Sequence, residues 1–344
     1  MSTRESVSVV IPTYNRAKLV LRAIESVLRA TDRDDEIIVV DDGSTDDTRE
    51  VVRPLLNRVR YIRLVNGGPG FARNAGIRAA THPLVAFLDS DDEWLADKLV
   101  IQRAVMAAHP EIVLTFSTFI VREDSGSETA DGLAAYWLDH PQAWHEVLGA
   151  GRPLSSIMPL PEGRADCMVY SGDLYPALLD QMYVAASTAV VRRKLAGKAF
   201  AFPEDLRICE DWSCFSRVAR QGPVCYVDAP TAVNHGHDGP RLTSEQGMYG
   251  LLASRIKMIQ RIWARDKVFL AKHEGRVERV LAELYRRRAR WLVSHGRPAE
   301  ARRDLRMTRG SNWMLKVACM LPSGLTLLMG EIRQAVLDVL VNNL

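Results

Sequence analysis

Four short apolar runs constrain the fold of the first hundred residues more than any other feature of this sequence. The runs lie at 7–12, 36–40, 59–65 and 84–88 and are rich in valine and isoleucine. Helical patterns separate them, at 17–30, 45–56 and 71–81. Because parallel strands need crossover connections, this order predicts a Rossmann-like α/β fold, a mostly parallel sheet flanked by helices.

Unusual polar residues follow each of the four predicted strands. They are found at 13–15, 41–42, 66–70 and 89–92. Ligands of open α/β sheets bind beyond the carboxyl ends of the strands. The four polar stretches therefore predict a single site at one edge of the sheet.

Clustered carboxylates indicate what this site binds. The stretch "LVAFLDSDDEWL" brings Asp89, Asp91 and Asp92 within four positions. In extended backbone Asp89 and Asp91 would point to the same side, and such a pair suits Mg²⁺ or Mn²⁺, which fill their other positions with water and substrate phosphates. Such a metal could neutralise a substrate diphosphate. Arg73, near the start of a helix after a glycine-rich loop, would add positive charge to bind this diphosphate. The alternative is that these aspartates cap a helix starting at Trp94, a role that we assign to Asp92.

Several other classes of protein are disfavoured by the sequence. No G-x-G-x-x-G follows the first run, and no G-x-x-x-x-G-K-[ST] is present. The five cysteines form no Cys-x-x-Cys pair, so neither a zinc site nor a disulfide framework is indicated. The sequence has no apolar signal core and no clean run of about 18 to 20 apolar residues. We therefore expect a cytoplasmic protein.

The C-terminal region, 246–344, is predicted to be basic, amphipathic and helical. Arginines are grouped at 286–288 and 290, although the net charge of the whole chain is only +3. A basic stretch followed by the interrupted apolar segment 313–330 suits the surface of an anionic membrane. The alternative is that 313–341 packs on the rest of the chain while the arginines are solvated. No nucleic-acid module accompanies them, so nucleic-acid binding is not expected.

Five stretches resemble the motifs of family 2 glycosyltransferases, in their order and spacing. They are "SVVIPTYNR", "IIVVDDGSTDDT", "GGPGFARNAGI", "VAFLDSDDEW" and "ICEDWSCFSRVARQG". The resemblance covers 6 to about 240 and is strongest in 6–105. It implies a GT-A catalytic domain at 1–245, with a nucleotide-sugar-binding half at 1–105 and an acceptor half at 106–245.

The activity that the resemblance implies is inverting transfer of a sugar from a nucleoside-diphosphate sugar, most often a UDP-sugar. The acceptor would be a carbohydrate or a lipid-linked molecule in the biosynthesis of cell-surface polysaccharide or glycolipid. The same resemblance is consistent with a peripheral position on the cytoplasmic face of the inner membrane.

The donor side of the site is also assigned by the resemblance. Tyr14 would lie against the nucleotide base, Asp42 would contact the base, and Asp89 would contact the ribose. The remaining nucleotide-binding residues would be Pro12, Thr13, Gly70, Arg73 and Ser90. Asp91 would bind the divalent metal together with His237, or with His235 as the second choice. The alternative for both histidines is a solvent-exposed turn rich in Gly, Pro and Asp.

The acceptor side requires a base, because an inverting transfer must remove the proton of the attacking hydroxyl. The resemblance assigns this role to Asp211, with Glu210 lining the acceptor side, joined by Ser187, Thr188 and Trp212. The alternative is that Asp211 is an ordinary first-turn acid of its helix. A helix dipole lowers a carboxyl pKa, so a base at this position requires burial to offset the dipole.

Two rival functions remain open at this point. A sugar nucleotidyltransferase would be expected to carry a glycine-rich phosphate loop after the first strand, and "PTYNRAK" contains no glycine. A non-catalytic nucleotide-sugar-binding or scaffold protein could have lost Asp91 or Asp211, and both are present. The transferase interpretation is favoured because its chemistry is intact.

Overall fold

The computed structural model describes residues 5–235 and 242–308. The chain forms two compact units that divide between residues 240 and 241, and each is described by itself. His237 and the apolar segment 313–330, both singled out in the sequence, lie outside the described residues.

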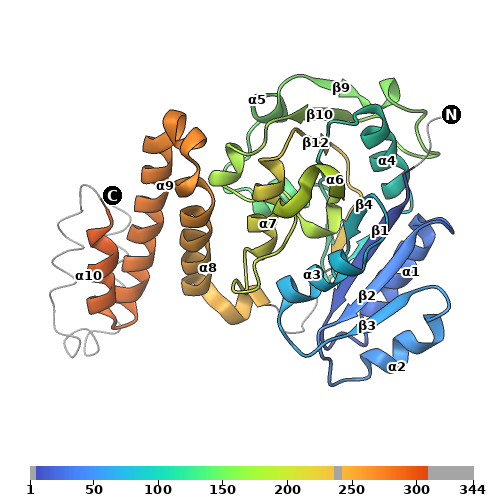
Figure 1. The fold of residues 1–344 in the computed structure, drawn as a ribbon, viewed down its shortest axis with the longest axis horizontal. Helices are drawn as coiled ribbons and strands as arrows, with labels where there is room; N and C mark the ends of the chain where they lie inside the picture. Colours follow the sequence, from blue (N-terminus) through green and yellow to red (C-terminus); the bar gives the residue numbers. More distant parts are fainter. Residues whose placement is uncertain (1–4, 236–241, 309–344) are drawn as a thin grey trace. The chain divides into compact units, whose positions relative to one another are not determined.

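The first unit is built on a nine-stranded sheet, shown in Figure 1. Its strand order is β3 (Arg60–Arg63), β2 (Glu36–Asp41), β1 (Val7–Thr13), β4 (Leu84–Phe87), β11 (Val190–Arg192), β6 (Leu114–Ser117), β12 (Val224–Val227), β10 (Met168–Gly172) and β9 (Gly151–Pro153). β1 pairs in parallel with β2 and β4, and β2 with β3. β11 pairs antiparallel with both of its neighbours, as does β10. The predicted α/β fold with a mostly parallel sheet is confirmed.

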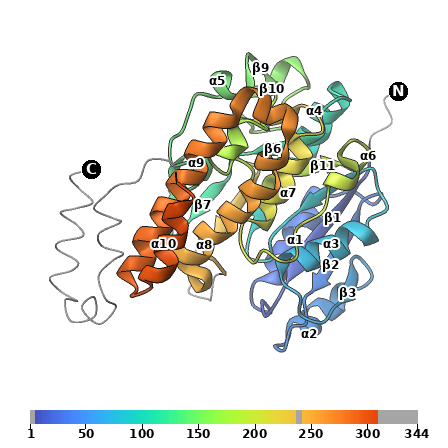
Figure 2. The same cartoon turned by 60° about the vertical axis from the view of Figure 1, so that its left-hand side comes forward.

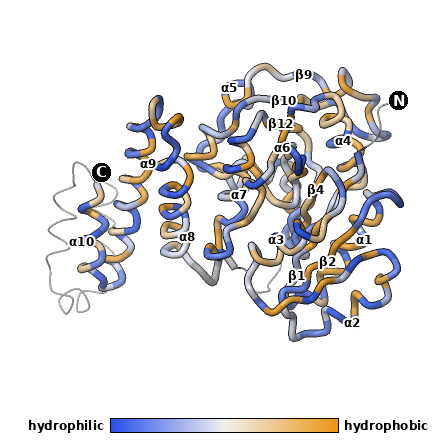
Figure 3. The backbone as a smooth tube through the Cα atoms, in the orientation of Figure 1, coloured by the Kyte–Doolittle hydropathy of each residue, from blue (hydrophilic) through white to orange (hydrophobic). Residues whose placement is uncertain are grey.

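The first four strands form where the apolar runs predicted them. All seven residues of β1 and all four of β4 are buried, because helices cover both faces of a parallel sheet and no residue of a central strand faces water. β3 lies at the edge of the sheet, and only its two middle residues are partly buried. The hydrophobic colouring of Figure 3 is accordingly concentrated along β1 and β2.

Helices connect the strands of this unit. They are α1 (Val20–Ala30), α2 (Thr48–Val52), α3 (Pro69–Ala79), α4 (Lys98–Ala108), α5 (Trp144–Leu148), α6 (Arg193–Ala196) and α7 (Glu210–Ala219). α3 lies close against β1: a Cβ on Gly76 would be 2.2 Å from Cγ1 of Val10. This close approach fixes the residues at the start of α3 relative to the ends of the strands.

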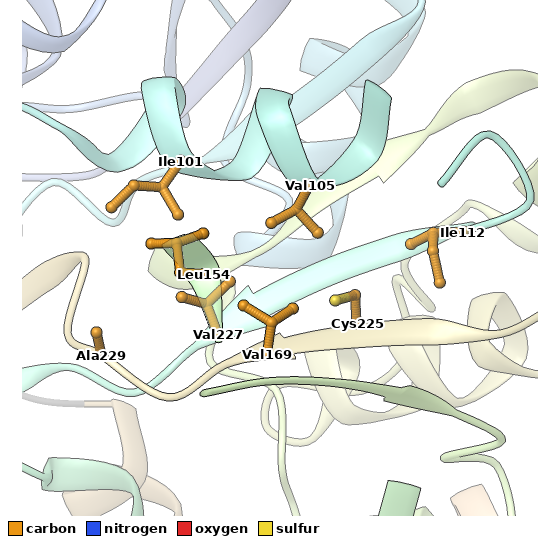
Figure 4. Packing of buried hydrophobic residues seen from close by; sticks show 8 residues of the cluster. All are labelled: Ile101, Val105, Ile112, Leu154, Val169, Cys225, Val227 and Ala229. Atoms are coloured by element: carbon orange, nitrogen blue, oxygen red, sulfur yellow. The ribbon is translucent and has the colours of Figure 1, made fainter. Parts of the chain in front are cut away.

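The second half of the sheet has its own apolar core, which Figure 4 shows from close by. Ile101 and Val105 of α4 pack over Val169, Cys225 and Val227, which come from β10 and β12. All five are almost fully buried. Burial of one such aliphatic side chain contributes roughly 1.5–3 kcal/mol, so this core holds the later strands firmly to the sheet.

A smaller four-stranded sheet has the order β5 (Glu93–Trp94), β13 (Ala232–His235), β7 (Ile120–Arg122) and β8 (Glu128–Thr129). The sequence predicted that a helix starts at Trp94, and this is wrong. Trp94 pairs with Ala232 in this sheet, and the next helix, α4, begins at Lys98. Tertiary pairing has overridden a local helix-start pattern.

The second unit, as far as it is described, consists of α8 (Leu242–Arg261), α9 (Lys267–Ser294) and α10 (Pro298–Arg306), seen together in Figure 2. Asp266 caps the N-terminus of α9: its side chain accepts hydrogen bonds from the backbone N–H groups of Val268 and Phe269. Ala289, Leu292 and Val293 of α9 pack against Ala301 and Leu305 of α10. No helix within the described residues is long and apolar enough to cross a membrane.

Candidate active site

The acidic segment after β4 forms a turn, not the extended backbone assumed from the sequence. The N–H of Asp92 donates to the carbonyl oxygen of Asp89 at 3.0 Å. The side chains of Asp89 and Asp91 are 35% and 27% exposed, whereas Asp92 is buried. Two of the three carboxylates therefore remain open to a ligand, and each has its own arginine partner.

Asp92 does not cap a helix, and this prediction is wrong. Its carboxylate accepts the hydroxyl of Ser187 and, at 2.8 Å, the amide of Asn234. Burial, and then the charges of Asp91 and Asp89, raise the pKa of Asp92 well above its usual value. Asp92 thus anchors the acidic turn to the protein interior, while the side chains of Asp89 and Asp91 are partly exposed.

Arg73 connects the acidic turn to helix α7. Its Nη2 donates to Oδ1 of Asp89 at 2.6 Å, and its Nη1 donates to Oε1 of Glu210 at 2.7 Å. Burial alone would lower the pKa of Arg73, but the charges of Asp89, Glu210 and Asp211 together raise it. The guanidinium is therefore a fixed positive charge shared by the two acidic elements.

Glu210 and Asp211 form the first turn of α7. The preceding residue, Cys209, has φ 63°, a left-handed conformation that is uncommon for any residue other than glycine. Burial and the charge of Asp211 raise the pKa of Glu210 to about 7, against the opposing effect of Arg73. Burial also raises the pKa of Asp211, although Arg73 and the N–H of Trp212 lower it. The desolvation that a base at Asp211 requires is therefore present.

The glycine-rich loop before α3 is held by Asp42. The N–H groups of Gly67 and Gly68 donate to its two carboxylate oxygens at 2.8 and 2.7 Å. Its own N–H donates to the carbonyl oxygen of Thr13 at 2.9 Å. Burial raises the pKa of Asp42 in spite of these bonds. Asp42 thereby joins the ends of β1 and β2 to the loop.

Other predicted donor residues line the same edge. Tyr14 follows β1 and is 45% exposed. Pro12, Thr13, Gly70 and Ser90 are buried. Two buried polar atoms here, Oγ1 of Thr13 and Nε of Arg73, have no hydrogen-bond partner within the described residues. Buried polar atoms are normally paired, so these two are consistent with a polar ligand at this edge.

The predicted acceptor-side residues are mostly internal. Thr188 is fully buried, and its carbonyl oxygen accepts bonds from Lys98 and Gln102, both at 2.8 Å. Trp212 is 6% exposed and donates from its indole nitrogen to the carbonyl oxygen of Leu178. Ser187 is buried because it supports the acidic turn through Asp92. All three side chains are buried in this structure.

His235, the second choice for a metal ligand, lies at the end of β13 and contacts Glu93, with Nε2 3.2 Å from Oε2. Burial, and the charge of Arg22, lower its pKa. Within the described residues no group of three or more His, Cys, Asp or Glu could hold a metal ion. The residues present fit a cation that takes only one or two carboxylates from the protein and its other ligands from phosphate and water.

Three residues that hold the site together were not predicted as part of it. Arg22 donates to the carbonyl oxygen of Asp91 at 2.7 Å, and Nε of Arg16 lies 3.6 Å from its carboxylate. Asn234 binds Asp92 across 142 positions of sequence. Arg16 lies in the stretch "SVVIPTYNR" and could have been predicted as a residue of the site. Nothing in the local sequence points to Asn234.

Comparison with known protein families gives this geometry a context. The family model described as "Glycosyl transferase family 2" matches residues 8–144, which span β1 to the start of α5. Residues 8–144 therefore form a glycosyltransferase family 2 domain. The resemblance predicted from the motifs is thus confirmed.

Among curated relatives of this family, an uncharacterized glycosyltransferase of Rickettsia conorii is 30% identical over 224 residues, which are 64% of this chain and 31% of the relative. The UDP-Glc:alpha-D-GlcNAc-diphosphoundecaprenol beta-1,3-glucosyltransferase WfaP of Escherichia coli is 33% identical over 123 residues, 35% of this chain and 48% of that protein. The matched part spans about a third of the length of the first of these relatives and about half of the second.

Two solved structures share the fold of this chain. Staphylococcus aureus TarS 1–349 in complex with UDP-GlcNAc has a TM-score of 0.54 at 18% identity, covering 87% of this chain and 88% of that one. The mannosyltransferase PcManGT from Pyrobaculum calidifontis, in complex with GDP-Man and Mn²⁺, has a TM-score of 0.53 at 19% identity, covering 98% and 82%. Together with the family match, these similarities confirm the predicted GT-A fold.

Proposed function

We propose that this chain is an inverting glycosyltransferase that moves a sugar from a nucleoside-diphosphate sugar, most often a UDP-sugar, to an acceptor hydroxyl. The observation that carries the proposal is the double ion pair of Arg73, with Asp89 at the donor edge and Glu210 beside Asp211. One buried cation thus joins the two groups of residues that bind a donor and activate an acceptor. One relative described above, WfaP, is by its name a glucosyltransferase that uses UDP-Glc.

The donor would lie across the carboxyl ends of β1, β2 and β4. Tyr14 offers its exposed ring to the base, Asp42 holds the loop beneath it, and Asp89 accepts the ribose hydroxyls. Mn²⁺ or Mg²⁺, held by Asp91, would neutralise the diphosphate and so stabilise it as a leaving group. Arg73 is a permanent positive charge beside this position.

Asp211 would act as the general base on the acceptor. Its carboxylate takes the proton of the attacking hydroxyl while that oxygen approaches the anomeric carbon opposite the diphosphate. The raised pKa of Asp211 makes the ionised form a better proton acceptor than an exposed aspartate. Glu210, fixed by Arg73, would line the acceptor side.

Isothermal titration calorimetry with UDP, GDP and dTDP, each with and without Mn²⁺, tests the donor site. We expect metal-dependent binding of one nucleotide that is lost in Asp91→Ala, followed by sugar transfer that is lost in Asp211→Asn. Binding without any turnover, either hydrolysis or transfer, would favour the alternative of a nucleotide-sugar-binding scaffold. Formation of a sugar nucleotide from a nucleoside triphosphate would favour a nucleotidyltransferase. Absence of binding by all three nucleotides would contradict the proposal.

The second part of the proposal concerns the acceptor, which would be a carbohydrate or a lipid-linked molecule in polysaccharide or glycolipid biosynthesis. Transfer would take place at the cytoplasmic face of a membrane. The name of WfaP describes a diphosphoundecaprenol-linked acceptor for that protein. Of the grouped arginines, Arg286 and Arg290 pair with Glu283, and Arg288 pairs with Asp304.

Four exposed arginines on α9 and α10 would contact anionic lipid: Arg279, Arg287, Arg303 and Arg306. Sedimentation with vesicles tests this contact. Binding that requires anionic lipid and weakens with salt is the expected result.

A further inference from the structure

Asn74, which follows Arg73 in helix α3, is almost completely buried and uses its whole side-chain amide. Nδ2 donates to the carbonyl oxygen of Phe202 at 2.8 Å and to Oε1 of Glu204 at 2.9 Å. Oδ1 accepts the N–H of Phe202 at 2.7 Å. One side chain therefore satisfies both peptide groups of a residue 128 positions away, as a neighbouring strand would.

The segment held in this way leads directly into the proposed base. Residues 200–209 form no helix or strand, and the segment ends in the left-handed Cys209 that precedes α7. Among the described residues, the N-cap residue of α7 makes no side-chain capping hydrogen bond. What anchors the segment before α7 therefore contributes to the position of Asp211, in addition to the packing of α7 itself.

α3 approaches the same segment along its first turns. A Cβ on Gly70 would lie 2.8 Å from the carbonyl oxygen of Pro203, so only glycine permits this contact. The ring of Phe202 packs edge-on against Phe87 of β4 and Phe215 of α7, with centroids 5.3 and 5.8 Å away. The contact thus continues from α3 through Phe202 to both β4 and α7.

We propose that Asn74 is a positioning residue that sets the distance between the donor carboxylates and Asp211, by clamping Phe202 to α3. Arg73 acts on the side chain of Glu210, and Asn74 acts on the backbone ahead of it, so the two consecutive residues are separate anchors for one catalytic helix. This inference rests on the proposed function for its effect on catalysis, but the clamp itself is measurable without activity.

Gln181 offers a matched control. It is as buried as Asn74, and its amide likewise bonds both peptide groups of one residue, His140, at 3.2 and 3.0 Å. It contacts none of the acidic residues of the site. Loss of either amide leaves two peptide groups without a partner, so both changes should destabilise the protein similarly.

The experiment compares Asn74→Leu with Gln181→Leu in the full chain. We expect kcat for sugar transfer to fall about 100-fold in Asn74→Leu, the effect of a misplacement of about 1 Å, with the affinity for UDP unchanged. Gln181→Leu should keep the kcat of the wild type. Equal kcat values for the two variants would overturn the inference.

Amide hydrogen exchange over 203–213 supplies the second readout. Exchange there should accelerate in Asn74→Leu and not in Gln181→Leu; an unchanged rate in Asn74→Leu would overturn the clamp. If Asn74→Leu does not fold, Asn74→Ala removes the same hydrogen bonds with the best helix-forming residue and without adding a branched side chain, so a change of the same kind is expected. Failure of the wild type to turn over any donor would count against the proposed function, whereas the exchange result would still decide the role of Asn74.

Discussion

Replacement of Glu210 by glutamine tests whether burial of this carboxyl group lowers the stability of the folded protein. Glu210 is 6% exposed, and its pKa is about 7, against a usual value of 4.5. The folded state therefore holds a proton that the unfolded state releases between these values, so stability falls as the pH rises through this interval. One pKa unit corresponds to about 1.4 kcal/mol in the free energy of unfolding. The whole interval therefore corresponds to about 3 kcal/mol, and the part of it from about pH 5.5 to about pH 7 corresponds to about 2 kcal/mol.

Glutamine has nearly the shape of the protonated acid and does not titrate. The assay is urea unfolding of the wild type and Glu210→Gln at about pH 5.5, 7 and 8. We expect the variant to be the more stable protein, by a margin that grows by about 2 kcal/mol up to pH 7 and then stays constant. Titrating groups that do not interact with Glu210 cancel in this difference, whereas Asp211, whose charge acts on Glu210, does not cancel completely. A margin that does not change with pH would refute the reasoning.

Further predictions concern the base, the packing of α3 and the buried lysine. Asp211→Asn should lower sugar transfer by about 10²–10⁴-fold without weakening UDP binding by calorimetry; loss of binding as well would contradict its role. Gly76→Ala should cost roughly 1–3 kcal/mol in urea unfolding because it meets Val10, whereas a Cβ at Gly222 meets nothing within 3.6 Å and should change stability by less than about 0.5 kcal/mol; equal effects would contradict this. Burial lowers the pKa of Lys98 in the folded protein. As the pH falls below about 10, Lys98 is therefore protonated in the unfolded state before it is protonated in the folded state, and the free energy of unfolding decreases. Lys98→Met should therefore lose less stability than the wild type on acidification, and parallel pH profiles would contradict this.

The first four strands could be predicted because each carries its information locally. A strand covered on both faces is a continuous apolar run, and alternation with helices implies parallel pairing. The insertion of β11 between β4 and β6 could not be predicted. Its three residues, Val190–Arg192, have no local feature that indicates with which strands they pair. The strand at Glu93–Trp94 was missed for the same reason.

The site was predictable in its charged residues and not in their surroundings. Asp89, Arg73 and Glu210 stand in separate motifs, and the structure brings them within hydrogen-bonding distance. The sequence did not reveal that Thr188 is fully buried, with its carbonyl oxygen bound by the amine of Lys98. Side-chain direction in such a turn depends on contacts that a single sequence does not contain.

The order of strands in the large sheet has a consequence for the synthesis of this protein. β4 emerges from the ribosome at Phe87, but its second neighbour, β11, follows only at Val190. At about 5–20 residues per second, the apolar edge of β4 stays unpaired for on the order of 5–20 s. An unpaired strand edge is a template for aggregation, so this interval is when a nascent chain most needs a chaperone, and a fragment that ends before β11 would keep that edge open permanently.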